Sequence, residues 1–140
     1  MGLYRVMLVD DEEDVRQAIA RKINWEEIGF QVVASAENGQ EALELLAAQP
    51  EYFYELIFMD IQMPVMNGYE ATKRIRAGES SYWKNMPVIA MTANVFRDDE
   101  CRAAECGMSG FITKPIDMDV IYSVLEKWLS ENHKESGSLL

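Results

Sequence analysis

The amino-acid sequence predicts an α/β domain with a five-stranded parallel sheet and helices on both faces. From Leu3 to Lys127 the chain alternates five times between a short apolar or β-branched run and a longer segment with helical periodicity. Runs such as Val6–Val9 are uninterrupted in apolar character, which is typical of parallel strands that are covered on both sides. These two observations favour one parallel sheet between two layers of helices.

The first half of the chain contains three expected strands and two expected helices. The strands are apolar or β-branched; the first helix has an acidic start and apolar residues at helical spacing, and the second helix ends near Pro50. The predicted strands are Leu3–Val9, Gln31–Ala36 and Leu56–Met59. The predicted helices are 12–23 and Glu41–Ala48, and a turn at Asn38-Gly39 precedes the second helix.

The second half continues the alternation. The predicted helices are Gly68–Ala77, Arg97–Cys106 and Asp117–Leu129, and the predicted strands between them are Val88–Met91 and Gly110–Ile112. Gly107 is expected to cap the helix before it, because glycine adopts the left-handed conformation that ends many helices. The polar residues 130–140 are predicted to be a disordered tail, which leaves 3–129 as the folded domain.

Composition limits the classes of function. At 140 residues and 49% hydrophobic content the chain is one domain, and its net charge of −11 disfavours direct binding to nucleic acid. The apolar stretch at the N-terminus is too short for a membrane span or a signal peptide. Cys101 and Cys106 lack the spacing of a zinc site and are interpreted as thiols of a reducing compartment. These features predict a cytoplasmic protein.

Five reactive side chains follow directly after predicted strands. They are Asp10 and Asp11 after the first strand, Asp60 after the third, Thr92 after the fourth and Lys114 after the fifth. The carboxyl ends of parallel strands meet at one edge of a sheet, which is where open α/β sheets bind ligands. Three acids, a hydroxyl and an amine at this edge predict a site for a divalent cation and a phosphoryl group.

The acids Asp10, Asp11 and Asp60 are candidate metal ligands. Three carboxylates at close range raise each other's pKa unless a cation neutralises them, and Mg²⁺ suits a site of carboxylates, a backbone carbonyl and water. The alternative is that the acidic run only caps the following helix and favours its dipole. We accept that alternative for Glu13 and Asp14.

Asp60 is also a candidate nucleophile, because it starts a tight loop at a strand end. A carboxylate in this position can attack phosphorus and form an aspartyl phosphate, provided that Mg²⁺ and Lys114 neutralise charge. Thr92 is placed to donate its hydroxyl to a phosphoryl oxygen. The Lys114-Pro115 bond can adopt the cis form, which would direct the ammonium group across the sheet edge.

Four ordered motifs resemble those of receiver domains of bacterial two-component response regulators, the CheY-like family. The likeness covers residues 3–129 and rests on Leu8-Val9-Asp10-Asp11-Glu12, Met59-Asp60-Ile61-Gln62-Met63-Pro64-Val65-Met66-Asn67-Gly68, Met91-Thr92-Ala93 and Thr113-Lys114-Pro115. It implies a doubly wound, flavodoxin-like fold with strand order 2-1-3-4-5. It also implies Mg²⁺ dependence and phosphotransfer from a histidine kinase or a histidine phosphotransfer protein.

The resemblance also assigns roles to individual residues. It implies that Asp60 is the phosphoacceptor, Asp11 a direct metal ligand, Asp10 a ligand through water and Gln62 a ligand through its backbone carbonyl. Thr92 and Lys114 match the positions that sense the phosphoryl group, and Phe111 matches the aromatic switch position. The protein would be a regulatory phosphoacceptor, with self-catalysed phosphotransfer and autodephosphorylation as its only chemistry.

Phosphorylation is expected to change the surface of predicted helix 97–106, strand 110–112 and helix 117–129, through movements of Thr92 and Phe111. This surface would bind partners and is the candidate homodimer interface. Gln62 and Asn94 follow Asp60 and Thr92 by two positions and are expected to affect the water that hydrolyses the phosphoryl group.

The output is left open by the sequence. Residues 24–30 and 35–39 look like receivers of helix-turn-helix transcription regulators, whereas residues 86–94 and 107–111 look more like receivers of hybrid sensor kinases. The chain is therefore expected to be either a stand-alone receiver or part of a longer protein.

Three other classes of function would need sequence features different from those of this chain. A phosphatase of the haloacid dehalogenase type would carry a second aspartate two residues after the nucleophile, where this chain has Gln62. A pseudo-receiver would lack an acid or the lysine, and none is missing. Flavin or nucleotide binding would need a phosphate-cradling loop after the first strand, where the acidic residues 10–14 would repel the ligand.

Overall fold

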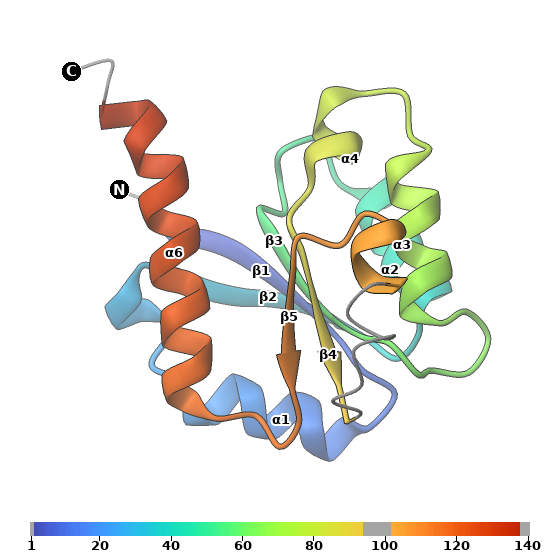
Figure 1. Ribbon diagram of the computed structural model, residues 1–140, viewed down its shortest axis with the longest axis horizontal. Helices are drawn as coiled ribbons and strands as arrows, with labels where there is room; N and C mark the ends of the chain where they lie inside the picture. Colours follow the sequence, from blue (N-terminus) through green and yellow to red (C-terminus); the bar gives the residue numbers. More distant parts are fainter. Residues whose placement is uncertain (1, 94–101, 138–140) are drawn as a thin grey trace.

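The computed structural model describes residues 2–93 and 102–137, with side chains up to Glu131. Its centre is a parallel sheet with the strand order β2-β1-β3-β4-β5, drawn in Figure 1. The strands are β1 (Tyr4–Val9), β2 (Phe30–Ala36), β3 (Leu56–Asp60), β4 (Val88–Thr92) and β5 (Gly110–Thr113). The predicted fold class and the strand order implied by the resemblance are both confirmed.

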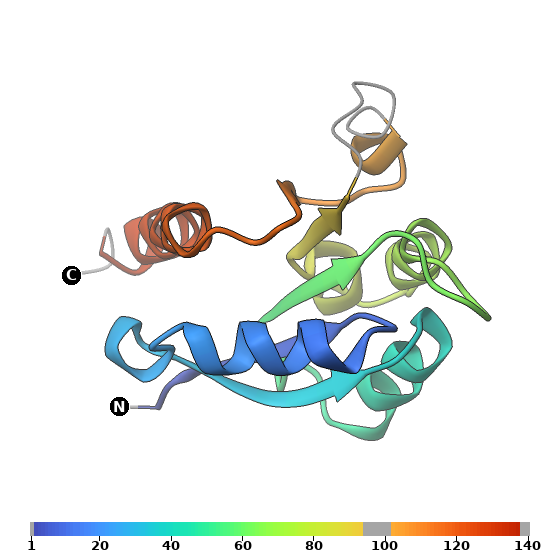
Figure 2. The same ribbon diagram turned by 90° about the horizontal axis from the view of Figure 1, so that it is seen from below.

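Helices cover both faces of the sheet. They are α1 (Glu13–Lys22), the 3₁₀ turn η1 (Glu26–Ile28), α2 (Gly39–Ala48), α3 (Gly68–Arg76), α4 (Ser81–Asn85) and α6 (Met118–Gly137). The apolar residues of α1 and α6 pack on one face, and those of α2, α3 and α4 pack on the other. Figure 2 shows α6 and the α2–α3 pair on opposite sides of the strands.

Successive residues of the central strands point alternately into the two cores. Leu8 and Phe58 belong to the core under α1 and α6, whereas Met7 and Met59 belong to the core under α2 and α3. All four side chains are at most 1% exposed. This double burial is the reason why the strands have uninterrupted apolar runs in the sequence.

The start of α2 differs from the expected turn at Asn38-Gly39. Asn38 is the N-cap, since its side-chain oxygen accepts the Glu41 N–H at 2.9 Å, and Gly39 is already helical. A Cβ atom on Gly39 would lie 2.8 Å from both the Ala71 Cβ and the Met66 carbonyl oxygen. Glycine therefore allows α2 to approach α3 and the loop before it.

Helix α4 was not predicted. It has only five residues and follows Ser80, whose hydroxyl accepts the Trp83 N–H at 3.3 Å. Arg76 at the end of α3 joins it to its surroundings by donating to the carbonyl oxygens of Trp83, Met86 and Gly107. Tertiary hydrogen bonds of this kind hold a helix that is too short to be detected by periodicity.

The predicted helix 97–106 is described only from Arg102, and residues 102–105 are helical. Gly107 has φ +99°, which confirms its predicted capping role. Helix α6 begins one residue later than expected and continues past Leu129 to Gly137, so its backbone enters the segment expected to be a disordered tail. Glutamate and lysine in this segment are good helix formers, and Gly137 stands where the helix ends.

Within the described residues, no helix combines the length and the apolar character that a bilayer crossing requires.

Candidate functional site

The sheet register brings the predicted residues to one edge. Asp60, the last residue of β3, pairs with Met91, and Thr92, the last residue of β4, pairs with Thr113. Asp10 follows β1, which lies directly beside β3, and Lys114 follows β5. Asp10, Asp60 and Thr92 are buried polar residues, with exposed fractions of 0%, 6% and 3%.

Lys114 bridges two of the acids. Its Nζ donates to Asp10 Oδ2 at 2.7 Å and lies 3.5 Å from Asp60 Oδ1. The Lys114 backbone N–H donates to the Thr92 carbonyl oxygen at 2.7 Å, and the bond to Pro115 is cis. Desolvation alone would lower the pKa of Lys114, but the Asp10 hydrogen bond and the charges of Asp60 and Asp10 raise it overall. Lys114 is therefore held as a cation.

Asp10 is fixed by four hydrogen bonds. Its N–H donates to the Ala36 carbonyl at 3.1 Å, Oδ1 accepts the Glu12 N–H at 2.9 Å and Oδ2 accepts the Lys114 ammonium. Its own carbonyl accepts a bond from Arg16 Nη1 at 2.5 Å. Asp10 thus anchors the loop that carries the next two acids, Asp11 and Glu12.

Asp60 is buried with incomplete charge compensation. Desolvation, and then repulsion by Asp10, raise its pKa to about 6, although Lys114 acts in the opposite direction. Gly68, at the start of α3, donates its N–H to the Ile61 carbonyl at 2.8 Å, and a Cβ there would collide with the Asp60 carbonyl. The glycine eight positions after the acid lets α3 begin directly against the strand end.

The acidic run has the geometry of a cation site. Asp10, Asp11 and Glu12 each offer a carboxylate oxygen, and these oxygens all lie within 4.8 Å of one another. Asp11 and Glu12 are exposed. The Asp60 carboxylate is not a member of this compact group, and Glu12, which is, was not among the predicted ligands. Its only sequence signal is its place in the acidic run.

This donor set fits Mg²⁺. All candidate side-chain ligands are carboxylate oxygens, which hard cations prefer, and the repulsion between Asp10 and Asp60 is a charge imbalance that a dication would relieve. The exposed Asp11 and Glu12, together with Asp10 and with Asp60 at the end of β3, are the residues that could hold the ion.

A cleft of about 500 Å³ opens at this edge. Its lining includes Asp11, Gln62, Asn67, Tyr69, Thr92 and Arg102. The predicted metal residue Gln62 is thus on the cleft wall. Phe111 is half-buried in β5 beside Ala90, packs against the core under α2 and α3, and does not line this cleft. Asn94 lies outside the described residues.

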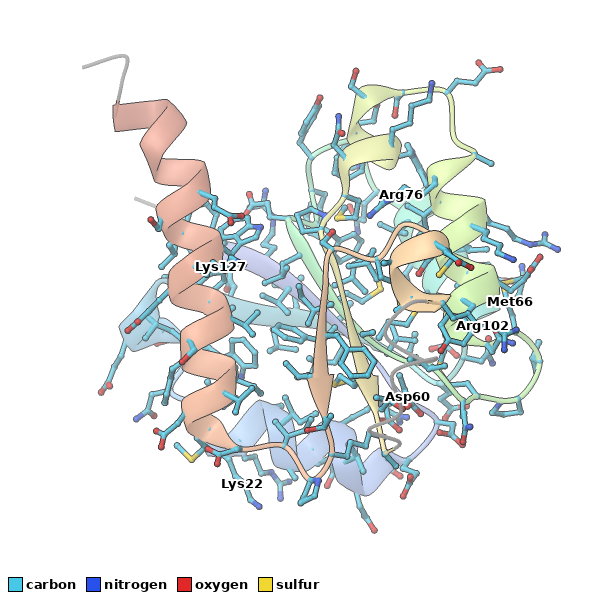
Figure 3. The ribbon with its side chains drawn as sticks, in the orientation of Figure 1. Lys22, Asp60, Met66, Arg76, Arg102 and Lys127 are labelled. Carbon is cyan, nitrogen blue, oxygen red and sulfur yellow. The ribbon has the colours of Figure 1, made fainter. Side chains whose placement is uncertain are left out.

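Sequence reasoning missed three residues around the site: Arg16, Tyr69 and Arg102. Arg16 lies one helical turn after Glu12, which could have suggested its contact with the acidic loop. Tyr69 and Arg102 are far apart in sequence, yet the Arg102 Cζ is 4.6 Å from the centre of the Tyr69 ring. Both Arg102, in the helical residues 102–105, and Asp60, at the end of β3, are labelled in Figure 3.

The chain is similar to known proteins over almost its whole length. Residues 6–126 match the family model of the response regulator receiver domain. The chain is 33% identical over 137 residues to hybrid signal transduction histidine kinase L of Dictyostelium discoideum, covering 97% of this chain and 8% of that protein. It is 36% identical over 125 residues to the CAI-1 autoinducer sensor kinase/phosphatase CqsS of Vibrio cholerae, covering 89% of this chain and 17% of that protein. It therefore spans only a small part of these relatives.

Solved structures agree with this match. The receiver domain of AraT, a response regulator from Geobacillus stearothermophilus, has a TM-score of 0.81 and 28% identity, with 96% of this chain and 98% of that one covered. The receiver domain of the sensor histidine kinase PA1611 from Pseudomonas aeruginosa, solved with a magnesium ion in its active-site cleft, has a TM-score of 0.76 and 28% identity, with coverages of 92% and 99%. Since the relatives come from Dictyostelium as well as from bacteria, they do not assign the chain to a bacterial branch. The chain belongs to the response regulator receiver domain family of two-component phosphorelay signalling.

Proposed function

We propose that Asp60 accepts a phosphoryl group from a histidine kinase or a histidine phosphotransfer protein, and that the modified domain then changes its affinity for partners. The observation that carries this proposal is the Lys114 ammonium between the Asp10 and Asp60 carboxylates, at 2.7 and 3.5 Å. A buried nucleophilic carboxylate needs such a cation nearby to react with an anionic phosphodonor.

In the proposed reaction, an Asp60 carboxylate oxygen forms a bond to phosphorus while the bond between phosphorus and the donor's histidine nitrogen breaks. The histidine leaves with the bonding electron pair. Lys114 is expected to form an ion pair with the new phosphoryl oxygens, because its ammonium already lies between Asp10 and Asp60. Thr92 is expected to donate its hydroxyl to one of these oxygens, since it ends the neighbouring strand.

Mg²⁺ would be held by Asp10, Asp11 and Asp60, with the Gln62 backbone carbonyl as a further ligand and Glu12 as an additional acid from the compact group. When bound, the ion supplies charge neutralisation for the phosphoryl oxygens. Support comes from the carboxylate donor set and from the magnesium ion in the cleft of the PA1611 receiver domain.

Phosphorylation would be reported through Thr92 and Phe111. Thr92 would move towards the phosphoryl group, and Phe111, half-buried in the adjacent strand β5, would turn inward. The surface formed by residues 102–106, β5 and α6 would then change its affinity for a partner or for a second copy of the chain. Gln62 on the cleft wall would influence the lifetime of the phosphoryl group by positioning or obstructing water.

The domain is proposed to act in the cytoplasm as a regulatory phosphoacceptor. The buried, free thiol of Cys106 is compatible with a reducing compartment. Self-catalysed phosphotransfer and autodephosphorylation would be its only reactions. The output would be that of a stand-alone receiver, of a transcription regulator or of a hybrid sensor kinase.

The test is covalent labelling of the whole chain with acetyl phosphate and Mg²⁺, read by intact-protein mass spectrometry. One phosphoryl group should be added, should be released by hydroxylamine, and should be absent from Asp60→Asn. Asp14→Asn is the matched control, because Asp14 is an exposed acid on α1 outside the compact group. It should be labelled like the wild type.

Full labelling of Asp60→Asn would show that another residue is the acceptor. Labelling of the wild type at the same rate in excess chelator would instead remove the proposed role of Mg²⁺.

A further inference from the structure

Arg102 provides a further cation at the candidate site. It lines the 500 Å³ cleft together with Thr92 and Gln62, and its guanidinium lies 4.6 Å from the centre of the Tyr69 ring. Tyr69 is only 5% exposed, whereas Arg102 is exposed. The buried ring therefore forms a fixed platform for a guanidinium at the cleft rim.

The cations near the cleft are held in different ways. Lys114 already bridges Asp10 and Asp60, and Arg16 Nη1 donates to the Asp10 carbonyl. In the part of the chain whose side chains are described, no carboxylate forms an ion pair with Arg102. A guanidinium has several N–H donors in one plane, and a cation–π contact with a ring leaves donors available for an anion.

The cleft is surrounded by negative charge, which the Arg102 guanidinium can offset. The chain has a net charge of −11, and exposed Asp11 lines the same cleft. An anionic molecule entering the cleft is repelled by these acids, and a guanidinium at the rim offsets that repulsion where the anion arrives. A space of about 500 Å³ is of the size that holds small ligands.

We propose that Arg102, oriented by Tyr69, is an anion-recognition residue that selects small phosphodonors by charge and favours dianionic acyl phosphates. The inference rests on the proposed phosphoacceptor role of Asp60. In the reaction, an Asp60 oxygen forms the new bond to phosphorus while the bond between phosphorus and the acyl oxygen breaks. The carboxylate leaves with the electron pair, and no further co-reactant is consumed. Arg102 binds the donor and determines specificity.

The test compares two donors on the whole chain with saturating Mg²⁺. Acetyl phosphate is dianionic near neutral pH, whereas phosphoramidate carries a smaller net charge. Initial labelling rates over a range of donor concentrations give the maximal rate and the half-saturating concentration. The variants are Arg102→Gln, Arg102→Lys and the matched control Arg74→Gln, which removes an exposed cation of α3 that pairs only with Glu70 among the described residues.

Arg102→Gln should lower the apparent second-order rate for acetyl phosphate by about fivefold, the effect of one cation at short range in a largely aqueous site. The loss should appear mainly as a higher half-saturating concentration, and it should be smaller for phosphoramidate. Arg102→Lys should recover most of the rate. Arg74→Gln, with the same change in net charge, should match the wild type. Higher salt should reduce the difference between the wild type and Arg102→Gln.

Unchanged rates in Arg102→Gln would overturn the inference, and so would equal losses for both donors or an equal loss in Arg74→Gln. The two proposals fail separately. If neither donor labels the wild type, the phosphoacceptor role itself is refuted. If the wild type is labelled and Arg102→Gln behaves identically, only the recognition role of Arg102 is refuted.

Discussion

The two ends of the sheet bury polar groups in opposite ways. At the amino end, the Tyr82 hydroxyl donates to the Tyr54 carbonyl at 2.8 Å and accepts the Tyr54 N–H at 3.2 Å. Arg5 donates to the Phe53 carbonyl at 2.5 Å, lies over the Phe53 ring and pairs with Glu55. Each of these polar groups has a complementary partner.

At the carboxyl end, one ammonium serves two buried carboxylates. Lys114 bonds Asp10 closely and Asp60 more distantly, and the pKa of Asp60 is raised to about 6. The amino end should therefore add to the free energy of unfolding, whereas the carboxyl end should lower it until a cation binds. A reactive site is kept at the cost of stability, and the opposite end of the same strands offsets that cost.

The largest expected effect is on the balance at the carboxyl end. Lys114→Met should lower the free energy of unfolding by about 3 kcal/mol at neutral pH in chelator, because it leaves two buried carboxylates without their ammonium partner. The loss should shrink when Mg²⁺ is added or when the pH is lowered. Urea unfolding followed by tryptophan fluorescence measures it.

Lys127→Met is the control for this change, because Lys127 is an exposed lysine on α6. An equal loss of stability in the two variants would contradict the bridging role of Lys114.

The next effect tests the amino end. Tyr82→Phe should lower the free energy of unfolding by about 2 kcal/mol, because it removes the hydrogen-bond partner of the buried Tyr54 N–H and carbonyl groups. Burial raises the pKa of Tyr82 to about 12, so the hydroxyl stays neutral and the cost should not vary between pH 5 and 9. Chemical denaturation at several pH values gives this cost.

Tyr52→Phe should be neutral, because the Tyr52 ring is 63% exposed and keeps its contact with Tyr82. Phosphoryl labelling of Tyr82→Phe should proceed at the wild-type rate. A slower labelling rate would contradict the expectation that the two ends of the sheet act independently.

A gain in stability is expected from Asp60→Asn in chelator. The raised pKa means that the folded state holds the Asp60 proton up to about pH 6, whereas the unfolded state releases it near 3.8. The charge of Asp60 therefore lowers the free energy of unfolding as pH rises between these values. The variant should be more stable by about 1–2 kcal/mol above pH 6, and the gain should vanish near pH 4.

Thermal unfolding at pH 4, 5, 6, 7 and 8, with Asp14→Asn as the control, tests this sign. A variant less stable than the wild type at pH 8 in chelator would show that the Lys114 contact outweighs desolvation and repulsion.

The smallest expected effect concerns the loop at the cleft rim. Val65 has φ +66° and is 82% exposed, and the Met66 N–H closes a tight turn on the Pro64 carbonyl at 2.7 Å. A β-branched residue is strained in this conformation, whereas glycine is not, although glycine loses more entropy on folding. Val65→Gly should raise the free energy of unfolding by about 0.5–1 kcal/mol.

Val65→Ala, which keeps a Cβ atom, should gain less than Val65→Gly. Thermal unfolding of both variants measures the difference, and a destabilised glycine variant would show that the valine side chain makes a stabilising contact.

The sequence alone determined the strands, their parallel arrangement and the sheet edge at which the candidate site residues lie. Apolar runs that are buried on both faces cannot be mistaken for alternating edge strands, and reactive residues directly after such runs must meet at the carboxyl edge. For this reason the sequence by itself predicts that Asp10, Asp60, Thr92 and Lys114 lie at the same edge. Local signals also sufficed for the Gly107 cap.

Only the tertiary structure decided which side chains touch. The bridge from Lys114 to Asp10 and Asp60 depends on side-chain directions across three strands, and the contact of Arg102 with Tyr69 joins segments that no periodicity relates. Helix α4 escaped prediction because five residues are too few for a periodic signal. Local sequence patterns report burial and backbone conformation, whereas distances between charges are set by how the elements pack. The raised pKa of Asp60 is therefore a property of the fold.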